Sequence, residues 1–191
     1  MAELIERVGA IDFTPRRLPP LHSIVHAIIN QQLSGRAAET IRGRFYALFE
    51  EVEFPHPEAI LSLHVESLRG AGLSRAKTIY IRDVAQKALD RVLPTLEECD
   101  ALSDEELIER LTTIKGVGRW TVEMLLIFNL GRPDILPVHD LGIRKGFQIV
   151  YRKRAMPKPR ALDKFGQRWS PYRTTAARYL WRAVDLAKVK R

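Results

Sequence analysis

The chain is poor in cysteine and has no long apolar run. Cys99 is its only cysteine in 191 residues, which excludes an internal disulfide and a zinc or iron–sulfur site made of four cysteines. No apolar run approaches the ~20 residues of a membrane-spanning helix. The start, Met1 to Arg7, carries acids and lacks the apolar core of a signal peptide. We therefore expect a cytoplasmic protein with a reduced thiol and no membrane association.

The sequence also lacks β-strand alternation and repeats of 20–50 residues. Apolar residues instead recur at helical spacing, as between Leu21 and Ile29, where they fall at i, i+3, i+4, i+7 and i+8. The length suits one domain or two small lobes. We predict an all-α fold in one domain, with two helical lobes flanking an active-site cleft. The first lobe is expected at roughly 1–50 plus 150–191 and the second at roughly 55–149.

Acidic residues are outnumbered by basic ones, which give a net charge of +8 and a pI of about 9.9. Such an excess on a compact protein is typical of a polyanion partner, and DNA, RNA and an anionic membrane all qualify. The alternative is a solvated basic surface that binds nothing in particular. A hydrophobic content of 46% is ordinary for a folded protein and argues against disorder.

A short glycine turn, Gly116-Val117-Gly118, separates two helical segments. Ser103 to Glu106 reads as a capping box that opens the first of them. Glycines allow backbone angles that a side chain would forbid. They also leave the amides of Gly118, Arg119 and Trp120 bare at the start of the second helix, where the helix dipole favours an anion such as a DNA phosphate. The alternative is an ordinary glycine-terminated helix.

Asp140 is the carboxylate most suited to chemistry. It follows a proline-bounded loop and begins a helix, where the dipole favours its ionised form. Aspartate is also a preferred helix cap, so capping alone is the alternative role. The histidines, including His139 beside it, show no helical spacing for zinc.

Three segments occur in the order typical of the helix-hairpin-helix (HhH-GPD) DNA glycosylases. They are Gln31-Gln32-Leu33-Ser34, the hairpin Gly116 to Thr121, and Leu136 to Lys145. The resemblance covers roughly residues 21–185. Within the family, the hairpin sequence is similar to that of bacterial 3-methyladenine DNA glycosylase II.

The resemblance implies the chemistry. Asp140 stands where the family has its catalytic aspartate, which stabilises the positive charge that develops on deoxyribose as the N-glycosidic bond breaks. Members that also nick the strand carry a Schiff-base lysine where this chain has Trp120. Lys115 lies on the wrong side of the glycines. The resemblance therefore implies a monofunctional glycosylase without AP lyase activity.

Aromatic residues are the expected substrate contacts. The resemblance places Trp120 and Trp181 in a pocket that stacks on the flipped, electron-poor base, since aromatic faces attract cations. Met124 lies one turn after Trp120, and Tyr172 lies in the lead-in to the last helix. For Trp181, the helical stripe around it leaves a plain core position as the alternative.

Residues on three turns are the expected DNA contacts. Gln32 or Leu33 at an elbow between helices is a candidate wedge for the gap left by the flipped base, although a polar turn capped by Ser34 explains the segment equally well. Ser74 and Lys77 start another helix and are candidates for a second phosphate, with a plain cap as the alternative. The complete set is Gln32, Leu33, Ser34, Ser74, Lys77, Gly116, Gly118, Arg119 and Thr121.

These expectations define a monomeric enzyme of the bacterial cytosol and nucleoid that acts on double-stranded DNA containing alkylated bases. It removes 3-methyladenine, with 7-methylguanine as a further candidate, in base excision repair. No cofactor is expected, and the backbone carbonyls of Thr112, Ile114 and Val117 are a candidate site for a sodium or potassium ion. A non-catalytic damage-binding module and a glycosylase for deaminated bases are the alternatives.

Overall fold

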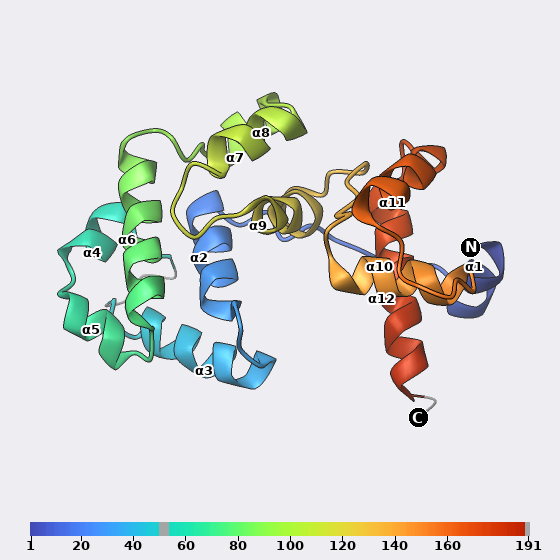
Figure 1. The fold of residues 1–191 in the computed structure, drawn as a ribbon. Coiled ribbons are helices and arrows are strands. Elements are labelled where there is room, and N and C mark those ends of the chain that lie inside the picture. Colours follow the sequence, from blue (N-terminus) through green and yellow to red (C-terminus); the bar gives the residue numbers. More distant parts are fainter. Residues whose placement is uncertain (50–53, 190–191) are drawn as a thin grey trace. The chain divides into compact units, whose positions relative to one another are not determined.

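The computed structural model describes residues 1–49 and 54–189. Helices and loops account for all of this described part, which contains no strand, so the predicted all-α class is confirmed (Figure 1). None of its helices is long and apolar enough to cross a bilayer. In chain order the elements are α1 (Ala2–Val8), α2 (Pro20–Asn30), α3 (Gly35–Tyr46), α4 (Pro57–Ser62), α5 (Val65–Gly70), α6 (Arg75–Leu89), α7 (Leu96–Ala101), α8 (Asp104–Leu111), α9 (Arg119–Met124), the π-helix η1 (Leu125–Leu130), α10 (Leu141–Val150), α11 (Pro159–Gly166), the 3₁₀ turn η2 (Gln167–Trp169) and α12 (Arg173–Val189).

The chain forms two compact units. The first joins Met1–Arg16 to Leu126–Arg191, and the second is Arg17–Leu125. The division differs from the lobes predicted from the sequence, because α2 packs on α6 within the second unit and α10 packs on α12 within the first. The predicted lobe boundary at residue 50 lies outside the described residues.

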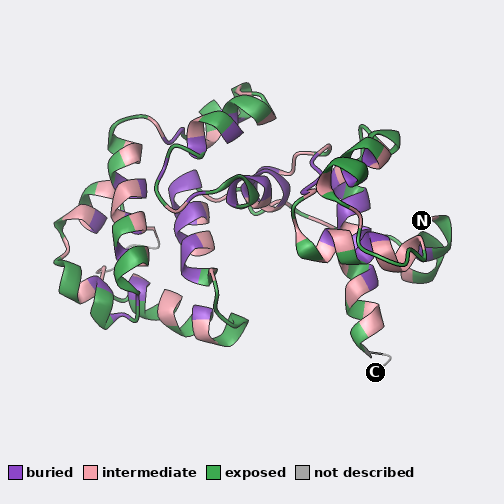
Figure 2. Ribbon diagram, in the orientation of Figure 1, coloured by how far each residue is buried: buried purple, intermediate pink, exposed green. Residues whose placement is uncertain are grey.

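The second unit is built around α2 and α6, which lie side by side, while α3, α4 and α5 also pack against one or the other (Figure 1). The apolar stripe predicted for α2 is confirmed, since Figure 2 shows α2 largely buried. Its buried members are Leu21, Ile24, Val25, Ile28 and Ile29. Cys99 on α7 is fully buried as well.

In the first unit, α10 and α12 approach very closely at Gly146. A Cβ atom at this position would overlap the backbone carbonyl of Leu180, so no residue with a side chain fits there without a shift. Around the crossing lies an apolar core to which α11 contributes Leu162. Since Asp140 begins α10, this close packing fixes the helix that carries the candidate catalytic group.

Two elements were not predicted from the sequence. Helix α7 begins with a capping box in which Thr95 accepts from the Glu98 amide and Glu98 accepts from the Thr95 amide. The helix that starts at Arg119 widens into the π-helix η1, a form that is rare and often found near functional sites. The predicted capping box at Ser103 and Glu106 is confirmed.

Candidate active site and DNA-binding turns

Asp140 has two functions in the local structure of the first unit. Its Oδ1 accepts a hydrogen bond from the Ile143 amide at 2.8 Å, which caps α10. The same oxygen accepts a second bond from the indole Nε1 of Trp181 at 2.9 Å. The carboxylate is partly exposed and held at the positive end of a ten-residue helix. Two donors therefore fix the orientation of the carboxylate.

Trp181 is more than a core residue. Its ring stacks on Phe128, with centroids 5.6 Å apart and planes inclined by 30°. Both rings line an open hollow in the first unit whose other residues are Val8, Ala10, Ile11, Asp12, Arg178, Arg182 and Asp185. The sequence allows two positions for Trp181, in the apolar core or in a substrate pocket. The structure gives it a partly buried surface position and an unpredicted bond to Asp140.

The loop that leads to Asp140 is fixed by an ion pair that the sequence analysis missed. Asp134 accepts from Arg173 Nε at 2.8 Å and from Ser170 Oγ at 2.8 Å. Arg173 holds the pKa of Asp134 below its usual value. The hydroxyl of the buried Thr174 also accepts a hydrogen bond from the Ile135 amide at 3.0 Å. The only sequence signal was that Asp134 follows Pro133 in a turn and Arg173 begins a helix.

Tyr172 lies in the turn between η2 and α12, and its side chain is 67% exposed. Its amide donates to the carbonyl of Trp169 at 2.7 Å. The preceding Ser170–Pro171 peptide bond is cis. The substrate contact expected for Tyr172 stays a prediction.

The two glycines of the hairpin turn differ in kind. Gly116 has φ of +80°, and a Cβ there would overlap the ring of Tyr80 on α6, so both conformation and packing require glycine. Gly118 has φ of −90°, and nothing lies within 4 Å of where its Cβ would be. The prediction that both glycines adopt angles forbidden to other residues is therefore wrong for Gly118, which any residue could occupy as far as the described chain is concerned.

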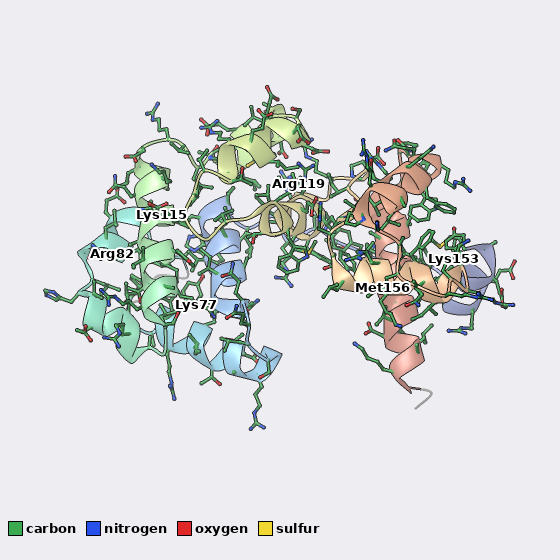
Figure 3. All side chains as sticks on the ribbon, in the orientation of Figure 1. Lys77, Arg82, Lys115, Arg119, Lys153 and Met156 are labelled. Atoms are coloured by element: carbon green, nitrogen blue, oxygen red, sulfur yellow. The ribbon has the colours of Figure 1, made fainter. Side chains whose placement is uncertain are left out.

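The side chain of Arg119 is about half exposed and forms ion pairs within the hairpin. It pairs with Glu105 of α8 at 3.0 Å and with the buried Glu123 of α9 at 3.2 Å. The hydrogen bond to Glu105 is the main cause that raises the pKa of Arg119. Figure 3 shows Arg119 beside α9, and Thr121 on the same helix is buried. The side chains of these two residues stabilise the hairpin, and their role in DNA binding stays a prediction.

Trp120 stands at the start of α9 with 46% of its surface exposed. Tryptophan is enriched at binding surfaces, so this position is compatible with the substrate contact expected for Trp120, which stays a prediction. Met124 follows one turn later on the same helix and is partly buried. Lys115, in contrast, is tied to α6, because its amide donates to Asp83 Oδ2 at 2.9 Å.

The elbow between α2 and α3 has an unusual backbone. Gln32 adopts φ of +57°, a left-handed conformation that non-glycine residues rarely occupy. Gln32 is exposed, and Leu33 exposes 38% of its surface. Ser34 caps α3 by accepting from the Ala37 amide at 3.4 Å, as predicted. An exposed leucine beside a left-handed residue suits either wedge assignment, and both stay predictions.

Ser74 caps α6 as predicted, accepting from the Lys77 amide at 3.2 Å. The side chain of Lys77 has partners that the sequence did not predict. Its ammonium donates to the carbonyls of Ile29 at 2.8 Å and Gln31 at 2.7 Å, so the side chain reaches across to the end of α2 (Figure 3). Partial burial lowers its pKa. The structure thus gives Lys77 two internal partners, and the predicted phosphate contact stays a prediction.

The candidate cation site is formed by backbone carbonyls of the hairpin turn. The carbonyl of Ile114 accepts from the Val117 amide at 3.1 Å, as in any tight turn. Among the described residues, no cluster of histidine, cysteine and carboxylate side chains is suited to a metal ion. The carbonyl site at Thr112, Ile114 and Val117 stays a prediction.

The fold and these motifs define a class of protein. The chain belongs to the HhH-GPD superfamily of base excision DNA repair proteins, whose family model matches residues 25–171. The DNA-3-methyladenine glycosylase 1 of Schizosaccharomyces pombe is 42% identical to it over 188 residues, which cover 96% of this chain and 82% of the relative.

Two solved structures are similar over nearly the whole chain. The S. pombe 3-methyladenine DNA glycosylase in complex with abasic DNA has a TM-score of 0.85 and 39% identity, and the match covers 95% of this chain and 89% of that one. A DNA-3-methyladenine glycosidase from Bacillus halodurans has a TM-score of 0.88 and 36% identity, with 98% and 85% covered.

Proposed function

We propose that this protein is a monofunctional DNA glycosylase that hydrolyses the N-glycosidic bond of alkylated purines during base excision repair. 3-Methyladenine is the main expected substrate and 7-methylguanine a further one. The observation that carries the proposal is the carboxylate of Asp140, held by the Trp181 indole at the N-terminus of α10. The protein is a hydrolase, and double-stranded DNA is its partner.

Asp140 is suited to the hydrolysis of a base that leaves easily. A purine methylated at N3 or N7 is already cationic, so it departs with little help from a general acid. The sugar then carries the developing positive charge, which a fixed carboxylate stabilises without reorganising. The same carboxylate can orient or deprotonate the attacking water. One carboxylate therefore suffices for the reaction.

The proposal includes no strand cleavage. A lyase needs an amine that attacks the sugar to form a Schiff base. The residue after Arg119 is an exposed tryptophan, whose indole nitrogen is not nucleophilic. Lys115 is bound to α6 through Asp83. We therefore expect an intact abasic site as the product.

Base release from damaged DNA tests the proposal. Methylated, deaminated and oxidised duplexes are incubated with the protein, and the free bases are separated by chromatography. We expect 3-methyladenine in the supernatant, with the abasic strand uncut until it is treated with alkali. Salt should weaken duplex binding steeply, by about tenfold for every few phosphates neutralised over a moderate range. Tight binding without any released base would instead indicate a non-catalytic damage-binding module. Release from the deaminated duplex alone would indicate a glycosylase for deaminated bases.

Replacing Trp181 with phenylalanine tests how Asp140 is held. Phenylalanine keeps an aromatic ring to stack on Phe128 but removes the Nε1 donor of the 2.9 Å bond to Asp140. A hydrogen bond to a charged group is worth about 1.5–3 kcal/mol, so single-turnover base release should slow roughly 10- to 100-fold. Thermal unfolding is the control, because it shows whether the variant is fully folded at the temperature of the assay. A variant that releases base at the wild-type rate would show that the indole does not position the carboxylate.

A further inference from the structure

Three turns of the second unit are connected by hydrogen bonds around the end of α2. Lys77 Nζ, from the first turn of α6, donates to the carbonyls of Ile29 and Gln31. The side-chain amide of Gln31 donates in turn to the carbonyl of Gly116 in the hairpin, at 3.1 Å. The elbow at Gln32 and Leu33 is thereby tied to two other elements immediately before it projects into solvent.

We propose that Lys77 is a positioning residue that holds the elbow Gln32-Leu33 in the shape needed to enter the duplex when a base is extruded. The proposal rests on the proposed function, since it names the part of the protein that replaces the flipped base. It assigns Lys77 to the insertion step and removes it from the phosphate contacts.

The backbone of the elbow explains why a tether is needed. Gln32 has φ of +57°, and such a conformation in a non-glycine residue persists only where the surrounding structure imposes it. The carbonyl of Gln31, immediately before it, is fixed by Lys77 at 2.7 Å. The left-handed residue is followed by the cap of α3 at Ser34, which fixes the other end. The backbone is therefore held on both sides of the exposed residues Gln32 and Leu33.

A lysine is well suited to this position. The last carbonyls of a helix have no partner within it and carry partial negative charge, so a cation that donates to them is stabilised. The ammonium has three donors, and two of them are used on Ile29 and Gln31. Because the ammonium already binds two carbonyls, it is poorly placed to bind a DNA phosphate as well. The two possible roles of Lys77, positioning the elbow and binding a phosphate, can therefore be distinguished by experiment.

The test replaces Lys77 with methionine, which keeps an unbranched stem and removes the ammonium. Lys87→Met is the matched control, because Lys87 lies on the same helix and, among the described residues, pairs with Asp90 at 3.7 Å. Three quantities are measured on the full chain. The first is the affinity for an undamaged duplex and its salt dependence. The second is the fluorescence rise of 2-aminopurine placed beside a 3-methyladenine analogue, which reports unstacking upon insertion. The third is single-turnover base release.

We expect Lys77→Met to leave the salt slope of undamaged binding unchanged and its Kd within about twofold of wild type. The fluorescence rise and single-turnover base release should both fall tenfold or more, while Lys87→Met matches wild type. Lys77→Arg, whose guanidinium can reach two carbonyls, should restore most of the loss. Loss of one phosphate contact would instead reduce the slope of log K against log salt concentration by ~0.9. Such a reduction in Lys77→Met, together with a normal fluorescence rise, would overturn the proposal.

A second variant covers the case in which Lys77→Met does not fold. Gln31→Leu removes the hydrogen bond that the part-buried Gln31 side chain donates to the Gly116 carbonyl. This variant should also reduce the fluorescence rise, and it should leave the salt slope of undamaged binding unchanged. Normal insertion in Gln31→Leu would count against the tether. The salt slope and the fluorescence rise do not depend on base release, so a wild-type protein that inserts into DNA yet frees no base would refute the proposed function and leave the tether intact.

Discussion

Asp140→Asn should slow single-turnover release of methylated purines by roughly 10²- to 10⁴-fold, the range typical of a lost electrostatic or acid–base group. Asparagine retains an oxygen that can accept from the Ile143 amide and from the Trp181 indole. The variant therefore loses the negative charge and keeps the local structure. Its affinity for undamaged duplex should be nearly that of wild type, as measured by fluorescence anisotropy.

Asp140→Ala is the matched comparison. Alanine loses both the charge and the cap of α10, and lost caps cost about 0.5–2 kcal/mol of stability. We expect the two variants to be equally slow but only Asp140→Ala to unfold at a lower temperature. Wild-type release by Asp140→Asn would remove the carboxylate from the mechanism.

Gly146→Ala should have the largest effect on stability. The new methyl group would overlap the Leu180 carbonyl, which is backbone and cannot rotate away, so α10 and α12 must separate. Overpacking of this kind costs about 1–3 kcal/mol and occasionally more. For a protein of this size each kcal/mol lowers Tm by about 2–4 °C. Thermal unfolding followed by circular dichroism measures the shift.

Gly43→Ala in α3 is the control for helix propensity. Gly43 is exposed, lies inside a helix and has nothing within 4 Å of its Cβ direction. Alanine there should stabilise the protein by up to about 1 kcal/mol. Equal Tm values for the Gly146 and Gly43 variants would mean that the crossing of α10 and α12 tolerates a side chain.

Local patterns predicted the helices well. The stripe from Leu21 to Ile29 is buried, and the caps at Ser34, Ser74, Ser103 and Asp140 are present, because each depends on residues three or four positions apart. The grouping of helices into units was not predictable in the same way. It depends on which apolar faces pack together, and α2 and α6 are far apart in the sequence.

Individual roles were harder to predict where a side chain has a long reach. Lys77 was assigned to a phosphate because a cation at a capped helix start fits one, yet its partners lie 46 and 48 residues earlier. The bond from Trp181 to Asp140 spans 41 residues. For Gly116 the need for a positive φ could be predicted from the sequence, but the contact with Tyr80, which also requires glycine, could not.

The buried Cys99 makes the protein a convenient subject for spectroscopy. As the only thiol of the chain and with none of its surface exposed, it should resist maleimide reagents as long as the protein is folded. A cysteine introduced at the exposed Leu33 would then be the one reactive thiol, with no need to remove Cys99. A dye attached there would report, in real time, when the elbow leaves water for the stacked bases.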